Sequence, residues 1–297
     1  MRSKKGDIKV EIRPYRSLLY MPGANTRALE KAQNLSTDAI IFDLEDAVAF
    51  SEKELARENV AVALKTKNYG NRSLIVRINS LETTWWKQDL LMVVNSNAHS
   101  VLIPKVNSSE DIKQIEGIIE SENPSKETKI WAMIETPDGV LNSRDISKAS
   151  QKMGGLVMGT NDLQKELDTR FTKNRLPLLN SLSMCVLAAK SAKVPCIDGV
   201  YNAFKDDDGL LHEAKQGRDL GFDGKTVIHP LQLEIVNDCF SPSFEDKELY
   251  LKQIEAFDLA VKNGKGVAVL DGKIIENLHV EIARKNLALM NSIQNLG

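Results

Sequence analysis

Cysteine, long apolar runs and an excess of basic charge are scarce or missing in this sequence of 297 residues. Its three cysteines, Cys185, Cys196 and Cys239, are widely spaced and form no CxxC pair, which argues against a zinc site or a disulfide framework and for a reducing compartment. No stretch approaches the roughly 18 consecutive apolar residues of a membrane span, and the first residues lack the apolar core of a signal peptide. We expect a soluble, cytoplasmic protein.

The charge balance and the missing motifs narrow the function further. With 39 Lys and Arg against 41 Asp and Glu the net charge is -2, whereas a nucleic-acid-binding protein would carry a basic excess. We find no internal repeat, no low-complexity segment and no GxGxxG turn of a dinucleotide-binding fold. The length allows one large domain or two small ones and suffices to bury a full core. We expect neither nucleic acid nor a membrane as a partner.

What the sequence does contain is a regular alternation of short apolar runs and segments with helical spacing. The apolar runs are Ser17–Met21, Ala39–Phe42, Leu74–Ile78, Val101–Ile103, Ile130–Ile134, Leu156–Met158, Ile197–Tyr201 and Thr226–Ile228. The helical segments between them are Arg27–Leu35, Glu52–Leu64, Trp85–Val94, Glu110–Ile119, Leu178–Ser191 and Leu211–Leu220. This alternation predicts βα units and a parallel sheet. Eight units in about 230 residues match a (β/α)8 TIM barrel, with a doubly wound open sheet as the alternative.

Reactive side chains follow each apolar run. They are found in Pro22-Gly23, Asp43 to Asp46, Arg77 to Asn79, Pro104-Lys105, Glu135 to Pro137, Gly159 to Asp162, Asp198 and His229-Pro230. Any one of these could be an ordinary loop with caps and turns, but eight in register are hard to explain in that way. Because barrel chemistry is built at the carboxyl ends of the strands, we expect the functional site there.

The stretch IIFDLEDAVA, residues 40–49, carries the densest group of acids. Asp43, Glu45 and Asp46 follow four apolar residues, and three carboxylates so close together repel one another. A nearby divalent cation is the usual reason for such a group. A solvated loop with acids near a helix N-terminus, where the helix dipole favours negative charge, is an equal alternative on this stretch alone.

Beyond residue 240 the chain is longer than a barrel needs. Leu231–Phe240 has helical spacing, the turn Ser241–Ser243 precedes a further helix at about Glu245–Lys262, and a last helix is expected over Leu278–Ile293. The turn signals Asn263-Gly264 and Asp271-Gly272 bracket runs that predict a short hairpin. We interpret residues 1–240 as a catalytic barrel and residues 241–297 as a C-terminal helical extension, either a lid or an arm that reaches a neighbouring subunit.

Several motifs in order resemble those of the citrate lyase β-subunit-like family within the HpcH/HpaI aldolases. They are RSLLYMPGAN, IIFDLEDAVA, VRINS, LIPKV, AMIETPDGVLN, MGTNDL and GKTVIHP, and the likeness runs from about Arg16 to Glu281. Within the family the chain is most similar to the malyl-CoA enzymes, and GVYNAFKDDDGL and DGKIIENLH resemble the branch that hydrolyses malyl-CoA. The resemblance implies a TIM barrel, a homotrimer or hexamer, a bound Mg2+ and a coenzyme A thioester as substrate.

The resemblance also implies the metal ligands, which fall on Glu135 and Asp162. Mg2+ prefers oxygen ligands and keeps several waters, so two carboxylates and substrate oxygens form a normal site. The structural alternatives are a helix N-terminal acid for Glu135 and an N-cap for Asp162. Asp43, Glu45 and Asp46 would then hold metal-bound waters.

Substrate contacts are implied at five positions. We predict that Tyr20, Lys31, Arg77, Glu135 and Asn161 contact the substrate or its coenzyme A. Arg77 sits inside an apolar run, where an unpaired charge is costly. Its planar fork suits a carboxylate or a thioester oxygen, and a buried ion pair with the strand-end acids is a compatible alternative.

Two positions depart from the pattern. Where malyl-CoA lyases often carry an arginine, this chain has Asn25, with Arg27 nearby, and Lys31 could equally be a solvated lysine. The lyases also carry an aspartate on the C-terminal segment that enters the neighbouring subunit's site, and here the residue is Glu276. Its extra methylene moves a general base by about 1 Å, which can cost roughly 100-fold in rate.

Glu276 puts carbon–carbon cleavage in doubt and is compatible with the activation of water. We predict Mg2+-dependent hydrolysis of a malyl-CoA-type thioester, with Arg77 and Glu276 as catalytic residues. The alternative is carbon–carbon cleavage of malyl-CoA, β-methylmalyl-CoA or citramalyl-CoA to acetyl-CoA and a 2-keto acid such as glyoxylate. A metal-dependent aldolase that needs no coenzyme A and a non-catalytic scaffold are further alternatives. His229 is expected to be structural at least as readily as catalytic.

Overall fold

The computed structural model describes residues 13–296 and contains a closed barrel of eight parallel strands in the order β1 to β8. The strands are β1 (Ser17–Pro22), β2 (Ala39–Asp43), β3 (Ser73–Arg77), β4 (Ser100–Ile103), β5 (Lys129–Ile134), β6 (Met153–Met158), β7 (Cys196–Asp198) and β8 (Gly224–Val227). Pairing of β1 with β8 closes the barrel. The predicted (β/α)8 barrel is confirmed, and the open sheet is excluded.

Alternation along each strand builds two separate apolar layers. In β1, Leu18 and Tyr20 belong to the cluster that fills the barrel interior, whereas Leu19 and Met21 belong to the larger cluster beneath the helices. Successive side chains of a strand point to opposite faces, so one strand serves both layers. The near-continuous apolar runs of the sequence are explained by strands that are buried on both faces.

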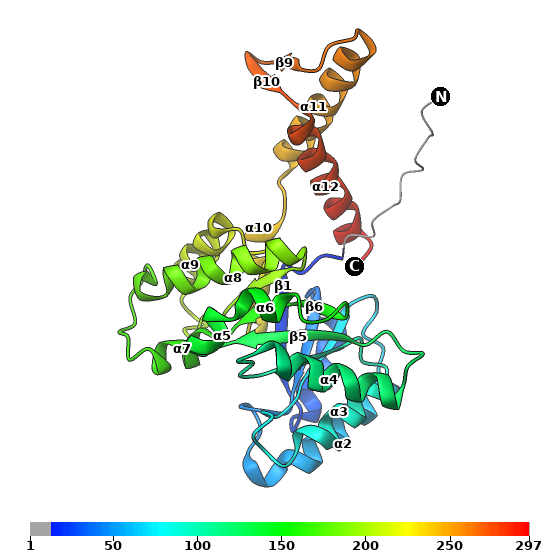
Figure 1. The fold of residues 1–297 in the computed structure, drawn as a ribbon, viewed down its shortest axis with the longest axis vertical. Coiled ribbons are helices and arrows are strands. Elements are labelled where there is room, and N and C mark those ends of the chain that lie inside the picture. The colour runs from blue at the N-terminus through cyan, green and yellow to red at the C-terminus, as the bar shows by residue number, and fades with distance from the viewer. Residues whose placement is uncertain (1–12, 297) are drawn as a thin grey trace. The chain divides into compact units, whose positions relative to one another are not determined.

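The helices connect the strands and cover the outside of the barrel (Figure 1). They are α1 (Thr26–Lys31), α2 (Lys53–Thr66), α3 (Trp86–Val94), α4 (Ser109–Glu122), α5 (Pro137–Leu141), α6 (Ser143–Ser147), α7 (Thr160–Glu166), α8 (Leu179–Ala192), α9 (Asp207–Leu220) and α10 (Leu233–Phe240). The short helices α5, α6 and α7 were not predicted, because segments of five to seven residues are too short for a helical period to stand out.

The seventh strand is shorter than predicted. The run Ile197–Tyr201 was expected to be strand throughout, but β7 ends at Asp198 and the next residues form a loop. Lys225 and Gln232 supply the physical reason. Their side chains donate to the carbonyl oxygens of Gly199, at 2.6 Å, and Tyr201, at 2.8 Å, so these carbonyls bond to side chains and not to a neighbouring strand.

The chain divides into two compact units, of which Tyr15–Phe240 is the barrel. The second includes Ser241–Leu296 and contains α11 (Phe244–Lys262), the antiparallel hairpin β9 (Ala268–Leu270) and β10 (Lys273–Ile275), and α12 (Asn277–Gln294). Its small buried cluster is built from Ala260, Ala268, Ile275 and Val280.

Two further features concern the helices and the cysteines. Among residues 13–296, no helix has the length and apolar character needed to cross a membrane. Cys185, Cys196 and Cys239 are free and buried, and burial raises the pKa of the Cys185 thiol to about 12. These thiols are packing residues and not nucleophiles.

Candidate active site

A cavity of about 290 Å³ opens at the carboxyl ends of the barrel strands. Its walls are Tyr20, Asp43, Asp46, Ala47, Arg77, Met133, Glu135, Met158, Gly159, Thr160, Asn161, Asp162, Val200, Asn202 and Ile228. The lining side chains come from the ends of most of the strands or from the loops that follow them. The predicted location of the site is thus the place where the barrel is hollowed.

Arg77, the last residue of β3, is the only cation among the residues that line this cavity. It is 6% exposed, and its guanidinium donates from Nε to Asp43 Oδ1 at 2.7 Å and from Nη2 to Asp43 Oδ2 at 2.6 Å. Its Nη1 lies 2.9 Å from Glu45 Oε2 and 3.3 Å from Asp46 Oδ2. The predicted ion pair with the strand-end acids is present, and it fixes the plane of the fork.

The three acids of the β2 end are not equivalent. Asp43 accepts two bonds from Arg77 and one each from the amides of Glu45 and Ala47, which occupy both of its oxygens. Burial opposes its ionisation, but Arg77 and the amide donors outweigh burial and hold the pKa of Asp43 below its usual range. Asp43 is therefore the anchor of Arg77. The water-holding role predicted for all three acids remains a prediction, for which Glu45 and Asp46 have more free oxygens.

Glu45 differs from Asp43 in the state of its carboxyl. Burial raises the pKa of Glu45 to about 8, and Arg77 offsets only part of that effect. Its Oε2 is buried without a hydrogen bond of good geometry, although Arg77 Nη1 lies 2.9 Å away. Burial therefore favours the protonated form of this carboxyl, and the contact with Arg77 favours the ionised form. Asp46 lies further out, with a side chain that is 65% exposed.

Glu135 follows β5 directly and is 2% exposed. Its Oε1 accepts the backbone N–H of Lys105 at 2.8 Å, and burial raises the pKa of Glu135 to about 7. The helix N-terminus expected nearby exists, but its cap is Thr136, whose side chain accepts the amide of Gly139. Glu135 is thus left facing the cavity and does not cap the helix.

Asp162 reaches the same cavity from the first turn of α7. Gly159, and not Asp162, occupies the N-cap position, so the N-cap interpretation of Asp162 is wrong. Asp162 is 34% exposed, and its Oδ2 lies 3.5 Å from Lys105 Nζ. A Cβ on Gly159 would come within 2.3 Å of Glu135 Oε2. Only glycine allows the chain to pass so close to this carboxylate.

Tyr20 from β1 forms part of the cavity wall with its hydroxyl inward. The hydroxyl is buried and has no hydrogen-bond partner, and the ring lies 4.9 Å from the Arg77 guanidinium. Burial raises the pKa of this phenol well above its ordinary value. A buried hydroxyl without a partner is costly unless a ligand completes it.

The donor set fits a magnesium ion that is shared with a ligand. Among residues 13–296, no three acidic, histidine or cysteine side chains converge into a complete metal cage. Glu135 and Asp162 nevertheless face one cavity, and the raised pKa of Glu135 marks an oxygen that a cation would stabilise. Mg2+ is commonly bound by one or two carboxylates with waters and substrate oxygens.

Other predicted residues lie outside this cavity. Lys31 is exposed at the end of α1, and Asn25 caps the start of that helix by accepting the amide of Ala28. His229 accepts the amide of Leu231 through Nδ1 at 3.2 Å, which supports a structural role. Glu276 is exposed and precedes α12 in the second unit.

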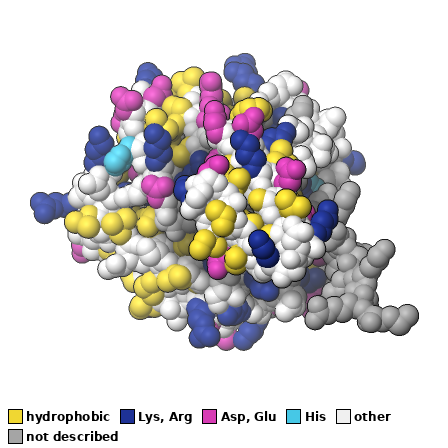
Figure 2. All heavy atoms as spheres, turned by 90° about the horizontal axis from the view of Figure 1, so that it is seen from above, with side chains coloured by type: hydrophobic (Ala, Val, Ile, Leu, Met, Phe, Trp, Pro, Cys, Tyr) yellow, Lys and Arg dark blue, Asp and Glu magenta, His cyan; other side chains and the backbone are white. Residues whose placement is uncertain are grey.

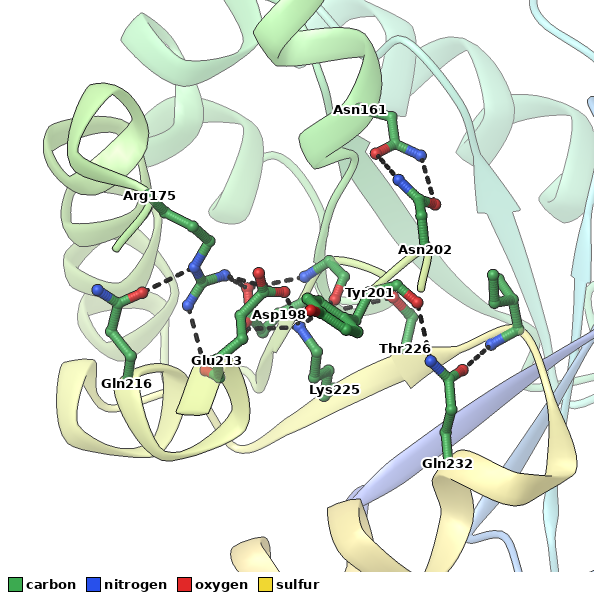
Figure 3. Close-up of polar contacts among 12 residues, drawn as sticks. Asn161, Arg175, Asp198, Tyr201, Asn202, Glu213, Gln216, Lys225, Thr226 and Gln232 are labelled. Atoms are coloured by element: carbon green, nitrogen blue, oxygen red, sulfur yellow. Dashed lines mark hydrogen bonds and ion pairs between the residues drawn. The ribbon is translucent and has the colours of Figure 1, made fainter. Parts of the chain in front are cut away.

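Sequence reasoning missed one wall of the cavity. Met133 is an inward-facing strand residue, Met158 is the last residue of β6, and Val200, Asn202 and Ile228 come from the β7 and β8 ends. Met133 could have been found from strand alternation alone. Asn202 was not singled out, although the quoted stretch GVYNAFKDDDGL contains it, because it lies beyond the shortened seventh strand. Its side chain exchanges two hydrogen bonds with that of Asn161, at 2.8 and 3.2 Å (Figure 3).

The fold and the site define a class of protein: a (β/α)8 barrel with buried acids and one anchored arginine at its carboxyl end. The family model for HpcH/HpaI aldolase/citrate lyase matches residues 16–230. The chain belongs to this family.

The sequence is similar to malyl-CoA thioesterases and to citrate lyase beta subunits. A (3S)-malyl-CoA thioesterase of Cereibacter sphaeroides is 51% identical over 284 residues, which are 96% of this chain and 97% of that protein. The citrate lyase subunit beta of Escherichia coli is 33% identical over 277 residues, 92% of each chain. Among solved structures, the citrate lyase beta subunit of M. tuberculosis complexed with oxaloacetate and magnesium is 26% identical. It has a TM-score of 0.67 and covers 77% of this chain and 98% of that one.

Proposed function

We propose that this protein is an enzyme that hydrolyses a malyl-CoA-type thioester, of which (3S)-malyl-CoA is the first candidate, to malate and coenzyme A with the help of Mg2+. The observation that carries the proposal is the cavity itself, in which Glu135 and Asp162 face a guanidinium fixed by three acids. The thioesterase that is 51% identical along 96% of this chain supports the choice of substrate and reaction.

Glu135 and Asp162 are the residues that would hold the metal. When bound, Mg2+ supplies a positive centre that orients and polarises substrate oxygens, here the hydroxyl and the carboxylate of the acyl group. The solved relative that carries magnesium with oxaloacetate, an acid of similar size to malate, supports this assignment. The Lys105 amide holds Glu135 in place through its 2.8 Å bond, so this ligand is pre-oriented.

Arg77 stabilises charge on the thioester oxygen. Its Nε and Nη2 are taken by Asp43, so the fork cannot rotate, and its Nη1 is shared between Glu45 and Asp46. A donor that is aligned before the reaction costs no reorganisation when the oxygen becomes negative. Tyr20, with a buried hydroxyl that has no partner in the protein, is the second donor available to the same substrate.

Glu276 is the proposed general base. It lies immediately before α12, is exposed, and follows a hairpin of the second unit. From a neighbouring subunit it would take a proton from water as the water attacks the thioester carbon, after which the C–S bond breaks and coenzyme A leaves. Attack by the carboxylate itself, to form a mixed anhydride, is the other route open to this residue. A homotrimer or hexamer, which the family resemblance implies, would bring such a neighbour within reach.

Carbon–carbon cleavage is the second candidate. The citrate lyase subunit that is 33% identical along 92% of the chain favours it, as does a fixed arginine able to stabilise an acetyl-CoA enolate. In that reaction a base removes the proton of the substrate hydroxyl, and glyoxylate leaves. Glutamate at position 276, one methylene longer than the aspartate of the lyases, weighs against it.

A paired assay separates the two reactions. Malyl-CoA is incubated with the protein, with and without Mg2+, and free thiol and glyoxylate are followed together. Hydrolysis predicts thiol release that depends on Mg2+ and yields malate without glyoxylate. Glyoxylate that appears in step with acetyl-CoA would contradict the thioesterase proposal, and thiol release at an equal rate without Mg2+ would contradict the role of the metal.

A further inference from the structure

The loop after β7, residues 199–202, is held in one conformation by side chains that the mechanism does not use. Lys225 is 0% exposed and donates to the carbonyl oxygen of Gly199 at 2.6 Å and to Asp198 Oδ2 at 3.2 Å. The amide of Gly199 in turn donates to Asp198 Oδ1 at 2.8 Å. A buried ion pair thus fixes the first peptide of the loop (Figure 3).

A second layer of charges supports this ion pair. Arg175 is 2% exposed and donates to Asp198 Oδ1 at 2.7 Å, and Lys225 also donates to Glu213 Oε1 at 2.7 Å. Two cations and two carboxylates therefore compensate one another away from water. Breaking such a group is costly because it leaves a buried charge without a partner. Such a buried group next to a cavity-lining loop indicates that the position of the loop matters.

Gln232 fixes the other end of the loop. It is 0% exposed, and its Nε2 donates to the carbonyl oxygen of Tyr201 at 2.8 Å. Its Oε1 accepts the amides of Ile228 at 2.9 Å and His229 at 3.2 Å. One buried amide therefore joins two segments, each of which contributes to the cavity wall (Figure 3).

Asn202 is the last residue of this loop, and it lines the cavity. Its amide and that of Asn161 donate to each other across the cavity edge, next to Asp162 (Figure 3). Each amide nitrogen has a second N–H, and in the described residues the pair uses only one from each. Arg77 is assigned to the thioester oxygen and is held there by three acids, so the free carboxylate of the acyl group calls for other donors.

We propose that Asn202 is a specificity-determining residue, which with Asn161 recognises the free carboxylate of the acyl group, and that Gln232 positions it. The inference rests on the proposed function, because it assigns a subsite within the same cavity. The ligand chemistry is a carboxylate oxygen that accepts N–H bonds from both amides. Neutral N–H donors at the cavity edge suit this carboxylate, because they hydrogen-bond its oxygens without adding a second charge beside the cation that Glu135 and Asp162 would hold.

The first test compares Asn202→Ala and Asn202→Asp with Asn95→Ala, which removes an exposed amide at the end of α3. Loss of a hydrogen bond to a charged group corresponds to about tenfold. We expect KM for malyl-CoA to rise by about that factor in Asn202→Ala, with kcat changed much less, and by more in Asn202→Asp, which repels the carboxylate. A 3-hydroxybutyryl-CoA probe, which lacks the free carboxylate, should be turned over equally by all the variants.

The second test removes the positioning bond alone. Gln232→Glu keeps the acceptor for Ile228 and His229 but loses the donor to Tyr201. We expect it to raise KM for malyl-CoA, and we expect the added effect of Asn202→Ala in that background to be small, since the two changes act on one interaction. Thermal unfolding of each variant separates this coupling from a general loss of stability.

The measurements on the wild-type protein and on the variants separate a failure of the Asn202 proposal from a failure of the proposed function. If the wild-type protein does not hydrolyse malyl-CoA, the proposed function fails. If the wild-type protein hydrolyses it but Asn202→Ala and Asn202→Asp share its KM, the inference is overturned. Additive effects of Gln232→Glu and Asn202→Ala would overturn the positioning role.

Discussion

The barrel and the C-terminal unit differ in the size of their buried cores and in how much of their apolar surface is exposed. The barrel buries large side chains on both faces of its strands and pairs its interior charges, as in Arg77 with Asp43 and Lys225 with Asp198. The C-terminal unit buries a small cluster of mostly small residues. It nevertheless exposes as many large apolar side chains as the much longer barrel segment.

This difference indicates what each unit requires. A surface rich in apolar side chains marks an interaction site, and one face of the molecule shows groups of such side chains open among charged ones (Figure 2). The exposed apolar residues of the C-terminal unit are Phe244, Leu249, Leu251, Leu259, Val261, Val267, Val269, Ile274, Leu278 and Ile282. The barrel holds its own core, whereas the exposed apolar surface of the second unit supports the proposal that this unit packs on another copy and delivers Glu276 there.

The largest expected effect comes from removing a proposed metal ligand of the barrel. Asp162→Ala and Glu135→Ala should each lower Mg2+-dependent turnover by at least about 1,000-fold, because the metal contributes several kcal/mol of charge stabilisation. Thiol release and Mg2+ titration calorimetry measure the effect, and circular dichroism checks the fold. Glu110→Gln, an exposed acid of α4, is the matched control. Retained turnover with unchanged metal dependence would remove the residue from the metal site.

Arg77→Lys tests the fixed fork. Lysine keeps the charge but loses the planar geometry that Asp43 holds with two bonds. We expect kcat to fall at least about tenfold, since one charge-assisted hydrogen bond in the transition state contributes more than about 1.4 kcal/mol. Arg16→Lys is the control, because Arg16 also pairs with an aspartate, Asp38, but lies outside the cavity. Near wild-type turnover in Arg77→Lys would make Arg77 structural.

The raised pKa of Glu135 predicts how metal binding depends on pH. The carboxyl keeps its proton up to about pH 7 in the folded, metal-free protein, whereas its ordinary value is 4.5. The proton must leave before Mg2+ binds, so the apparent affinity should rise up to about tenfold per pH unit below pH 7 and level off above it.

The raised pKa of Glu135 also determines whether the folded protein gains or loses stability as the pH rises. Between pH 4.5 and about 7 the unfolded chain binds fewer protons at Glu135 than the folded chain. The metal-free protein should therefore lose stability as pH rises through this window, and Mg2+ should restore it above pH 7. Calorimetry of Mg2+ binding in buffers of different ionisation enthalpy counts the proton that Glu135 releases when the metal binds. Affinity that does not change with pH would mean that Glu135 is already ionised.

The smallest effect is expected on the surface of the second unit. Val269 and Ile274 pair across the hairpin and are 70% and 63% exposed. Replacing both by serine should weaken association and lower turnover about fivefold in dilute solution, with recovery at high protein concentration, because the change acts through assembly. Lys273→Ser is the control on the same hairpin. Sedimentation that is identical for both variants would exclude this face from the interface.

The barrel could be predicted because its strands are buried on both faces and therefore appear in the sequence as short, nearly continuous apolar runs. The acids of the β2 end, Glu135 and Asp162 could be located because each follows such a run. The different roles of Asp43 and Glu45 could not be predicted from the sequence, because they depend on how deeply each carboxyl is buried and on which of its oxygens Arg77 contacts. The end of β7 was predicted too late in the chain. Lys225 and Gln232, which are distant in the sequence, donate hydrogen bonds to the carbonyl oxygens that follow the strand.

The measurement that tests the central claim most directly is subunit complementation. Asp162→Ala chains, which lack the proposed metal ligand, are mixed with Glu276→Ala chains, and subunits are allowed to exchange. If Glu276 acts in a neighbouring site, some interfaces join an intact cavity to an intact Glu276, and Mg2+-dependent thiol release returns. Glu281→Ala, an exposed acid on the same helix, should stay active without mixing. A mixture that stays inactive although subunits exchange, or full activity of Glu276→Ala alone, would contradict the account.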